Sequence, residues 1–284
     1  MLKTILLTLL ALIAFAGNSV LCRLALADEV IDAASFSAIR LLSGATFLLL
    51  LVLTRHKAAV GFTAGRWSSA GLLFLYAVTF SYAYISLDTG TGALILFGSV
   101  QLTMVLVALF TGNKLLAVEW LGLFVALAGL MVLLLPGATS PSLTSFILMA
   151  ASGVAWAFYT LAGQASKTPL LDTAGNFIKA LPLLMLLTFF TFDGAIISNT
   201  GIALAIASGA ITSGLGYAIW YSVLTQLSIT QAAIIQLTVP IIAAFGGVIF
   251  AQELISRQLM IASLLVLGGI FMVIVAKHYA RGNR

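Results

Sequence analysis

The segment ALILFGSVQLTMV (93–105) and the segment AAIIQLTVPIIAA (232–244) match, hydrophobic on hydrophobic, when the chain is compared with itself at an offset of 139 residues. The same offset aligns further residues without a gap: Arg40 with Lys179, Tyr82 with Tyr221, Leu115 with Leu254, and Gly129 with Gly268. The chain therefore reads as two copies of one unit, residues 1–139 and residues 140–284.

Composition places both units in a membrane. Hydrophobic residues make up 62% of the 284 and charged residues 7%, which a soluble domain of this length could not tolerate on its surface. Residues 120–166 and 194–252 contain no charged residue, and each stretch could hold two spans of about 20 residues. We expect an all-α integral membrane protein with ten transmembrane helices, at about 3–22, 34–54, 68–87, 91–111, 116–135, 143–166, 174–192, 200–225, 230–250 and 258–277.

Five spans per copy is an odd number, so the second copy must lie upside down relative to the first. Two inverted five-helix repeats are the signature of an alternating-access transporter whose binding site lies where the copies meet. The opening residues 1–22 resemble a signal peptide, but with nine further spans they are interpreted as an uncleaved first helix.

The positive charges predict the orientation. With both termini cytoplasmic, nine basic residues face inward and Arg23 and Arg257 face outward, as the positive-inside rule requires of a multi-pass inner-membrane protein. Because the bases gather on one side of the membrane, the net charge of +5 does not indicate a nucleic-acid partner. The expected partners are the lipid bilayer and a small-molecule substrate, and a monomer is compatible with the sequence.

The sequence lacks the residues that several other functions would require. The single cysteine excludes an intramolecular disulfide, and with both histidines outside the spans the sequence predicts neither a metal site nor a cofactor. An intramembrane enzyme is disfavoured because the predicted spans hold no histidine, aspartate or glutamate to act as an acid or base. A passive channel would normally show rings of charged groups or carbonyls, and saturable flux would separate a transporter from it.

Three features resemble a known family. They are the RLLSGA run (40–45), the TGTGALILFGSVQLTMV run (89–105), and Pro240 followed after twelve residues by Glu253-Leu254, ahead of a helix with Gly268-Gly269. This pattern is similar to the EamA domain of the drug/metabolite transporter superfamily, which typically occurs twice per chain. The first copy departs from it, with Gln101 and Lys114 at the proline and glutamate positions. The resemblance, which extends to the ten-span YddG-type exporters, implies efflux of small metabolites, amino acids above all.

Polar side chains within the spans are candidates for the binding site, because in hydrocarbon they need protein, water or substrate as a partner. Gln101 and Gln236 could grip a carboxylate or an ammonium group, or could simply form hydrogen bonds between helices. Trp156 is too deep for the interfacial aromatic belt and could stack on substrate, or pack among small neighbours. The proposed substrate-binding residues are Asn18, Tyr76, Tyr82, Ser99, Gln101, Trp156, Tyr217 and Gln236.

Two basic residues, Arg40 and Lys179, lie inside predicted helices at equivalent repeat positions. Each could attract a substrate carboxylate at a gate, Arg40 near the outer face and Lys179 near the inner, or could snorkel or pair with helix ends. Glu253 lies four residues before Arg257, a spacing compatible with a short helical ion pair.

The sequence therefore predicts a secondary transporter that exports amino acids or similar small metabolites by alternating access. Because all eight acidic residues lie in loops or at helix ends and both histidines lie outside the spans, uniport without coupling to protons or sodium is expected. Export of drugs or of nucleotide-type metabolites is the alternative within the same class.

Overall fold

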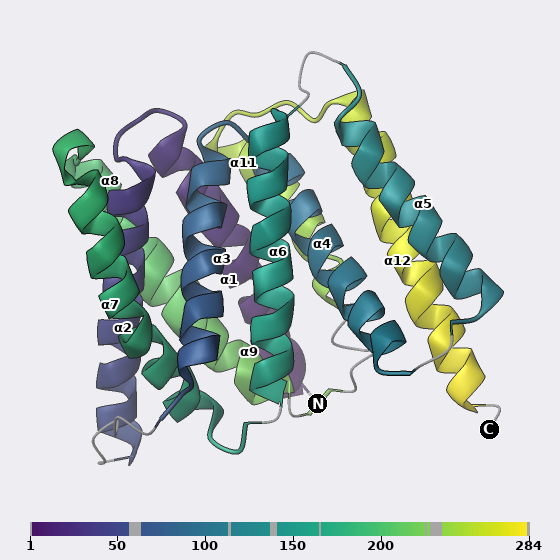
Figure 1. The fold of residues 1–284 in the computed structure, drawn as a ribbon, viewed down its shortest axis with the longest axis horizontal. Helices are drawn as coiled ribbons and strands as arrows, with labels where there is room; N and C mark the ends of the chain where they lie inside the picture. The colour runs from purple at the N-terminus through teal and green to yellow at the C-terminus, as the bar shows by residue number, and fades with distance from the viewer. Residues whose placement is uncertain are drawn as a thin grey trace.

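The computed structural model describes residues 2–56, 64–112, 115–136, 141–164, 166–224, 226–227 and 235–282. These residues form an all-α protein (Figure 1) without a strand in the described ranges; Ile31 and Ile197 form one isolated bridge. The elements are α1 (Leu2–Leu26), α2 (Ala33–His56), α3 (Trp67–Tyr84), α4 (Thr89–Phe110), α5 (Ala117–Leu133), α6 (Leu143–Gln164), α7 (Pro169–Thr191), the 3-10 turn η1 (Phe192–Gly194), α8 (Asn199–Ile206), the π-helix η2 (Ala207–Leu215), α9 (Gly216–Leu224), α11 (Val239–Phe250) and α12 (Arg257–Gly282).

The prediction of an all-α membrane protein is confirmed. Seven continuous helical segments of the described residues are long and apolar enough to cross a membrane, with α8, η2 and α9 counted as one. The helices Ala117–Leu133 and Val239–Phe250 are apolar but shorter. The first residues of the ninth predicted span, 230–234, lie outside the described residues, as do Lys57, Lys114 and Arg284.

Some boundaries differ from the expected ones. The helix α7 begins at Pro169, five residues before the predicted start at 174, because proline is well suited to the first turn of a helix, where its missing N–H is not needed. For the same reason Pro240 lies in the first turn of α11 rather than in a helix interior. The helix α1 extends to Leu26, so Arg23 belongs to its last turn rather than to a loop.

The predicted eighth span contains a π-helix. Residues Ala207–Leu215, with the sequence ASGAITSGL, separate α8 from α9. Small residues allow it to approach α2 closely: a Cβ on Gly209 would lie 2.1 Å from the carbonyl oxygen of Arg40. Wide π turns inside helices occur often at functional sites.

The helices form a main bundle with a pair at one side. In Figure 1 α5 and α12 run together at the edge of the molecule, and they pack extensively on each other. A Cβ on Gly122 would lie 2.5 Å from the carbonyl oxygen of Gly269, so the two backbones are in contact. In the main bundle α3 packs on α6, α2 on α7, and α1 on α11 and α9.

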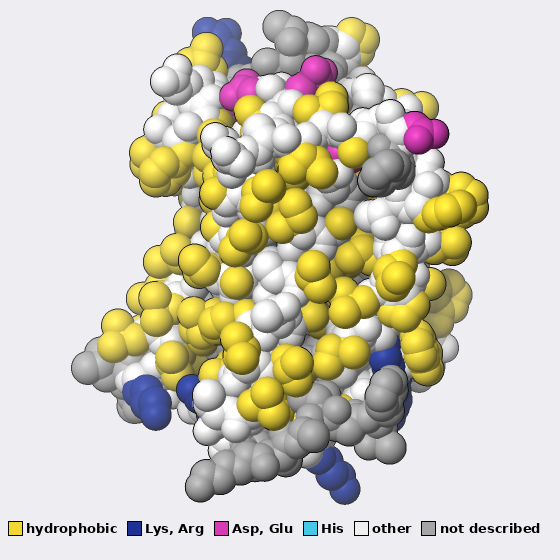
Figure 2. All heavy atoms as spheres, turned by 90° about the vertical axis from the view of Figure 1, so that its left-hand side faces the viewer, with side chains coloured by type: hydrophobic (Ala, Val, Ile, Leu, Met, Phe, Trp, Pro, Cys, Tyr) yellow, Lys and Arg dark blue, Asp and Glu magenta, His cyan; other side chains and the backbone are white. Residues whose placement is uncertain are grey.

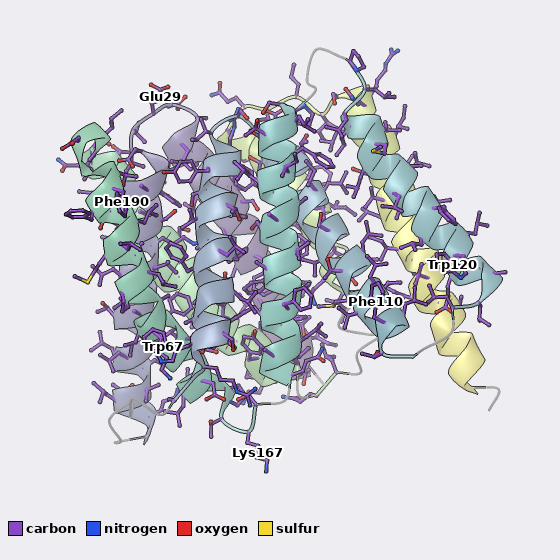
Figure 3. All side chains as sticks on the ribbon, in the orientation of Figure 1. Glu29, Trp67, Phe110, Trp120, Lys167 and Phe190 are labelled. Carbon is purple, nitrogen blue, oxygen red and sulfur yellow. The ribbon has the colours of Figure 1, made fainter. Side chains whose placement is uncertain are left out.

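Charge separates the two ends of the bundle. Figure 2 shows apolar side chains across the middle of one face, acidic groups toward one end and basic groups mostly toward the other. We call the end with residues 27–32, 85–88, 193–198 and 251–256 the acidic end, and the opposite end, with Lys3, Arg55, Arg66 and Lys167, the basic end. Glu29 and Lys167 mark the two ends in Figure 3.

Candidate functional site

A buried hydroxyl group on α3 connects three helices at the centre of the bundle. The Tyr76 oxygen lies 3.1 Å from Nη2 of Arg40 on α2, 3.3 Å from Nδ2 of Asn18 on α1, and 3.3 Å from the hydroxyl of Tyr217 on α9. Arg40, Asn18 and Tyr217 are the donors in these bonds, so the two lone pairs of the Tyr76 oxygen are taken. Tyr76 therefore holds together side chains from both copies of the sequence repeat.

Arg40 is 1% exposed and has no acidic partner in the described part of the chain. Its Nε donates to Ser213 at 3.2 Å, and its guanidinium carbon lies 5.3 Å and 5.0 Å from the ring centres of Tyr76 and Phe80. Among the described residues, Nη1 finds no hydrogen-bond acceptor. A buried cation is thus held by neutral groups, with one donor nitrogen unused.

The π-helix η2 completes this polar network. Ser208 donates to Oδ1 of Asn18 at 2.6 Å, and Thr212 lies 3.2 Å from the same oxygen. These bonds fix the Asn18 amide, so that its Nδ2 points to Tyr76. Sequence reasoning missed Ser208, Thr212 and Ser213, because small polar residues are common at helix contacts in membranes; the signal was the run SGAITSGLG (208–216).

Aromatic rings form the other wall of the centre. The Trp156 ring, 3% exposed, has its centre 4.8 Å from that of Tyr76, 4.8 Å from that of Tyr217 and 6.1 Å from that of Phe15. Tyr159, one helical turn along α6, lies 5.5 Å from Trp156. An indole between two tyrosines presents flat apolar faces beside the polar network, an arrangement that suits a substrate with both an apolar body and a polar group.

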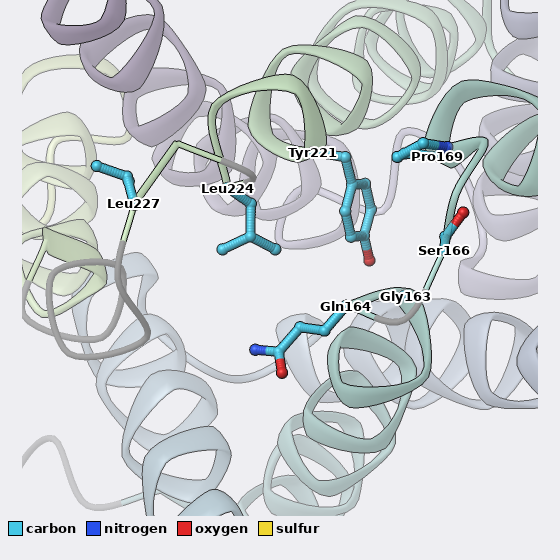
Figure 4. A pocket seen from close by; sticks show the side chains of 7 residues that line it. All are labelled: Gly163, Gln164, Ser166, Pro169, Tyr221, Leu224 and Leu227. Atoms are coloured by element: carbon cyan, nitrogen blue, oxygen red, sulfur yellow. The ribbon is translucent and has the colours of Figure 1, made fainter.

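The centre is closed in this conformation. A cavity of about 10 Å³, room for about one water molecule, lies among Phe15, Asn18, Tyr76, Phe80, Leu96, Phe97 and Trp156. Larger hollows lie toward the ends: one of about 490 Å³ at the acidic end, which includes Tyr82, and one of about 240 Å³ at the basic end. Figure 4 shows the second, where the Tyr221 ring points toward Gly163 and Gln164 of α6.

The structure does not bring all predicted site residues together. Asn18, Tyr76, Trp156, Tyr217 and Arg40 share the centre, whereas Tyr82 is half-buried at the acidic-end hollow. The remaining three candidates are buried elsewhere: Ser99 and Gln101 lie on α4, and Gln236 precedes α11.

Lys179 lies at the basic end. Its Nζ donates to the carbonyl oxygens of Ala64 and Gly65, both at 2.9 Å, and lies 5.9 Å from the centre of the Trp67 ring. It thereby ties α7 to the connection before α3.

Glu253 forms a different ion pair from the expected one. Its carboxylate accepts from Nε of Arg23 at 3.0 Å and from the backbone N–H of Thr89 at 2.9 Å. The expected pair with Arg257 does not form, because α12 starts only at Arg257 and Glu253 lies in the extended connection before it. Burial raises the pKa of Glu253, and its hydrogen bonds to Thr89 and the charge of Arg23 oppose that rise.

Comparison with known proteins finds a family match in the second half of the chain. Residues 143–275 match the EamA-like transporter family. An uncharacterized protein of Pseudomonas aeruginosa is 48% identical over 276 residues, which are 97% of this chain and 96% of that protein. Residues 143–275 of this chain thus resemble an EamA-like transporter domain. An uncharacterized transporter of Archaeoglobus fulgidus is 24% identical, over 97% of this chain and 99% of its own length.

A solved crystal structure shares the fold of this EamA-like chain. Its TM-score is 0.69 at 18% sequence identity, and the match covers 96% of this chain and 98% of that chain. Together with the apolar helices described above, the family match supports a membrane-embedded, multi-pass protein with a transporter domain.

Proposed function

We propose that this EamA-like protein is a secondary transporter that exports amino acids or similar small metabolites across the inner membrane by alternating access. The observation that carries the proposal is the central cluster around Tyr76. It combines buried polar groups and an indole at the junction of helices from both sequence copies, α1, α2 and α3 with α6, η2 and α9. Binding sites of alternating-access carriers lie at such junctions.

Helix packing supports two inverted repeats, residues 1–139 and 140–284. At the offset of 139, α1 corresponds to α6, α3 to η2 and α9, and α4 to α11. The contacts correspond as well: α3 packs on α6 as α9 packs on α1, and α4 packs on α6 as α11 packs on α1. The remaining counterparts, α2 with α7 and α5 with α12, pack on each other, as elements beside a two-fold axis would.

The hollows support alternating access through the centre. The acidic-end and basic-end hollows are separated by the closed cluster, so that opening either end in turn would expose the same residues. With the basic end cytoplasmic, both termini lie in the cytoplasm, in accord with the positive-inside rule. Nine spans are apolar helices by composition, and α3 would be the tenth. A total of ten spans fits this orientation.

The distribution of acidic groups favours uniport. All eight acidic residues lie in connections or within the first turn of a helix, so within the described spans no carboxylate is placed to carry a proton through the centre. Export of drugs or of nucleotide-type metabolites remains the alternative substrate assignment, to be separated by the same experiment.

The test is flux into and out of liposomes that contain the purified protein, with a panel of amino acids and common metabolites as substrates. Protein-dependent uptake that saturates with substrate concentration is expected for a carrier. Flux that rises linearly with concentration would indicate a channel and refute the proposal. Uphill accumulation driven by an imposed pH or sodium gradient would refute uniport.

A further inference from the structure

We propose that the central site selects monoanions, namely small organic acids with one carboxylate and an apolar body, over zwitterionic amino acids and over cations. The inference rests on the transport function proposed above and, among its small metabolites, assigns small organic acids in place of the amino acids themselves. It starts from the charge balance of the cluster around Tyr76, which carries one buried positive charge.

The first observation is that nothing in the described chain neutralises Arg40. Its contacts are a serine hydroxyl, a tyrosine hydroxyl and two aromatic faces, all of them neutral. The ion pairs described for the chain belong to Arg23 at the acidic end. A buried cation without a counter-ion is costly, and a bound ligand with one negative charge would remove that cost.

A zwitterion would not do the same. Its carboxylate could approach Arg40, but its ammonium group would need an acceptor of its own. In the polar network Oδ1 of Asn18 already accepts from Ser208 and Thr212, and the lone pairs of the Tyr76 oxygen already accept from Arg40 and Asn18. The net charge of the occupied site would also stay at +1.

The second observation is the surplus of donors. Nη1 of Arg40 has no acceptor, and Nη1 and Nη2 together present the planar edge that binds a carboxylate through two parallel hydrogen bonds. Nδ2 of Asn18 and the Tyr217 hydroxyl lie around the same Tyr76 oxygen. A carboxylate accepts hydrogen bonds and donates none, so it matches this set of groups.

The third observation places the cation beside the cavity. Tyr76 and Phe80, whose rings lie under the guanidinium, also line the small central cavity with Trp156. Widening this cavity by separation of α3 from α1 and α6 would bring the guanidinium edge and the indole face to one ligand. The carboxylate would bind at Arg40 and the apolar body at Trp156.

Direction follows from charge. The interior of a bacterial cell is electrically negative, so a monoanion that crosses the membrane alone is driven outward. A uniporter for monoanions is therefore an exporter without any coupled ion, whereas uniport of a zwitterion gains nothing from the potential.

The experiment uses probes that differ in charge alone. Liposomes of phosphatidylcholine and phosphatidylglycerol with the purified protein receive L-phenylalanine, 3-phenyllactate or L-phenylalaninamide, and the leucine series as a smaller apolar body. A potassium gradient with valinomycin sets the potential. We expect 3-phenyllactate or the leucine-derived hydroxy acid to exchange at least ~10-fold faster than the zwitterion, and to accumulate on the positive side up to ~50-fold per 100 mV.

Two variants assign the effect to the residue. Arg40→Gln should lower hydroxy-acid exchange at least ~30-fold, the loss typical of a truncated buried charge pair. Arg55→Gln removes one positive charge from the exposed end of the same helix and should change exchange less than ~3-fold, as an exposed charge would. If Arg40→Gln does not fold, the response of the unmodified protein to the potential decides alone.

The outcomes separate the two proposals. Faster exchange of zwitterions than of hydroxy acids, or hydroxy-acid flux that ignores the potential, would overturn the monoanion inference and leave the transport function intact. Absence of protein-dependent flux for every member of both series and of the wider metabolite panel would overturn the transport function and this inference with it.

Discussion

Removing the hydroxyl group of Tyr76 should destabilise the bundle more than any other single tyrosine hydroxyl change on α3. In Tyr76→Phe the ring still packs on Trp156 and under Arg40, at ring distances of 4.8 Å and 5.3 Å. The change removes the oxygen that Arg40 Nη2 and Asn18 Nδ2 use as an acceptor. Both donors are buried away from bulk water.

The magnitude follows from those two donors. A buried donor left unsatisfied costs ~1–3 kcal/mol, and more when it is charged. The measured contribution of one hydrogen bond between membrane helices to stability is smaller, ~0.6 kcal/mol on average and up to ~1.7 kcal/mol. With the charged Arg40 near ~2 kcal/mol and the neutral Asn18 near ~1 kcal/mol, the unfolding free energy should fall by about 3 kcal/mol.

The matched control is Tyr82→Phe, the same chemical change on the same helix. The Tyr82 side chain is half-buried and lines the acidic-end hollow, so its loss should cost less than ~0.5 kcal/mol. The assay is reversible unfolding by sodium dodecyl sulfate in mixed micelles, followed by circular dichroism. Equal destabilisation by the two variants would refute the role assigned to the Tyr76 hydroxyl.

Three further predictions concern transport, pH and orientation. Trp156→Ala should insert normally yet lower substrate exchange in liposomes at least ~10-fold, because it removes the central indole face. The control Trp120→Ala, at an exposed indole on α5, should change the exchange rate less than ~3-fold. Equal exchange rates for the two variants would exclude the central site. Because burial raises the pKa of Glu253, the carboxyl group of Glu253 stays protonated to higher pH in the folded protein than in the unfolded chain. The contribution of Glu253 to stability therefore falls as pH rises from the ordinary carboxyl pKa to the raised one. Glu253→Gln should remove that part of the slope in unfolding measured between about pH 4 and pH 7, and an unchanged slope would contradict the assignment. A cysteine at Ser142, at the acidic end, should react with an impermeant maleimide added to whole cells, and one at Lys167 only after the cells are opened; the reverse pattern would overturn the orientation.

The fold could be predicted from the sequence because long apolar runs are compatible with few structures other than membrane helices. The uncharged stretches 120–166 and 194–252 could only be buried in lipid or protein, and helices lie in both. Helix ends were less readable, since a membrane helix continues as long as its backbone bonds are satisfied. Arg23 shows this: its charge suggested a loop, but pairing with Glu253 allows it to remain in α1.

The candidate site was readable in part. Asn18, Tyr76, Trp156 and Tyr217 stood out as large polar or aromatic side chains at mid-span, and the structure places them together. Arg40 was expected at an outer gate because the sequence gives its depth along α2 and not the direction in which its long side chain reaches. The serines and the threonine of η2 could not be distinguished from packing residues, since the π turn that aims them at Asn18 and Arg40 depends on tertiary contacts.

The pairing of α5 with α12 sets an order for biogenesis. The face of α5 that carries Gly122, Ala126 and Gly129 packs on the last helix of the chain. Ribosomes release α5 long before α12, so during synthesis this small-residue face is bordered by lipid, or by the insertion machinery, until α12 has emerged. A nascent chain arrested before Arg257 would therefore leave α5 without its docking partner and open to quality-control proteases.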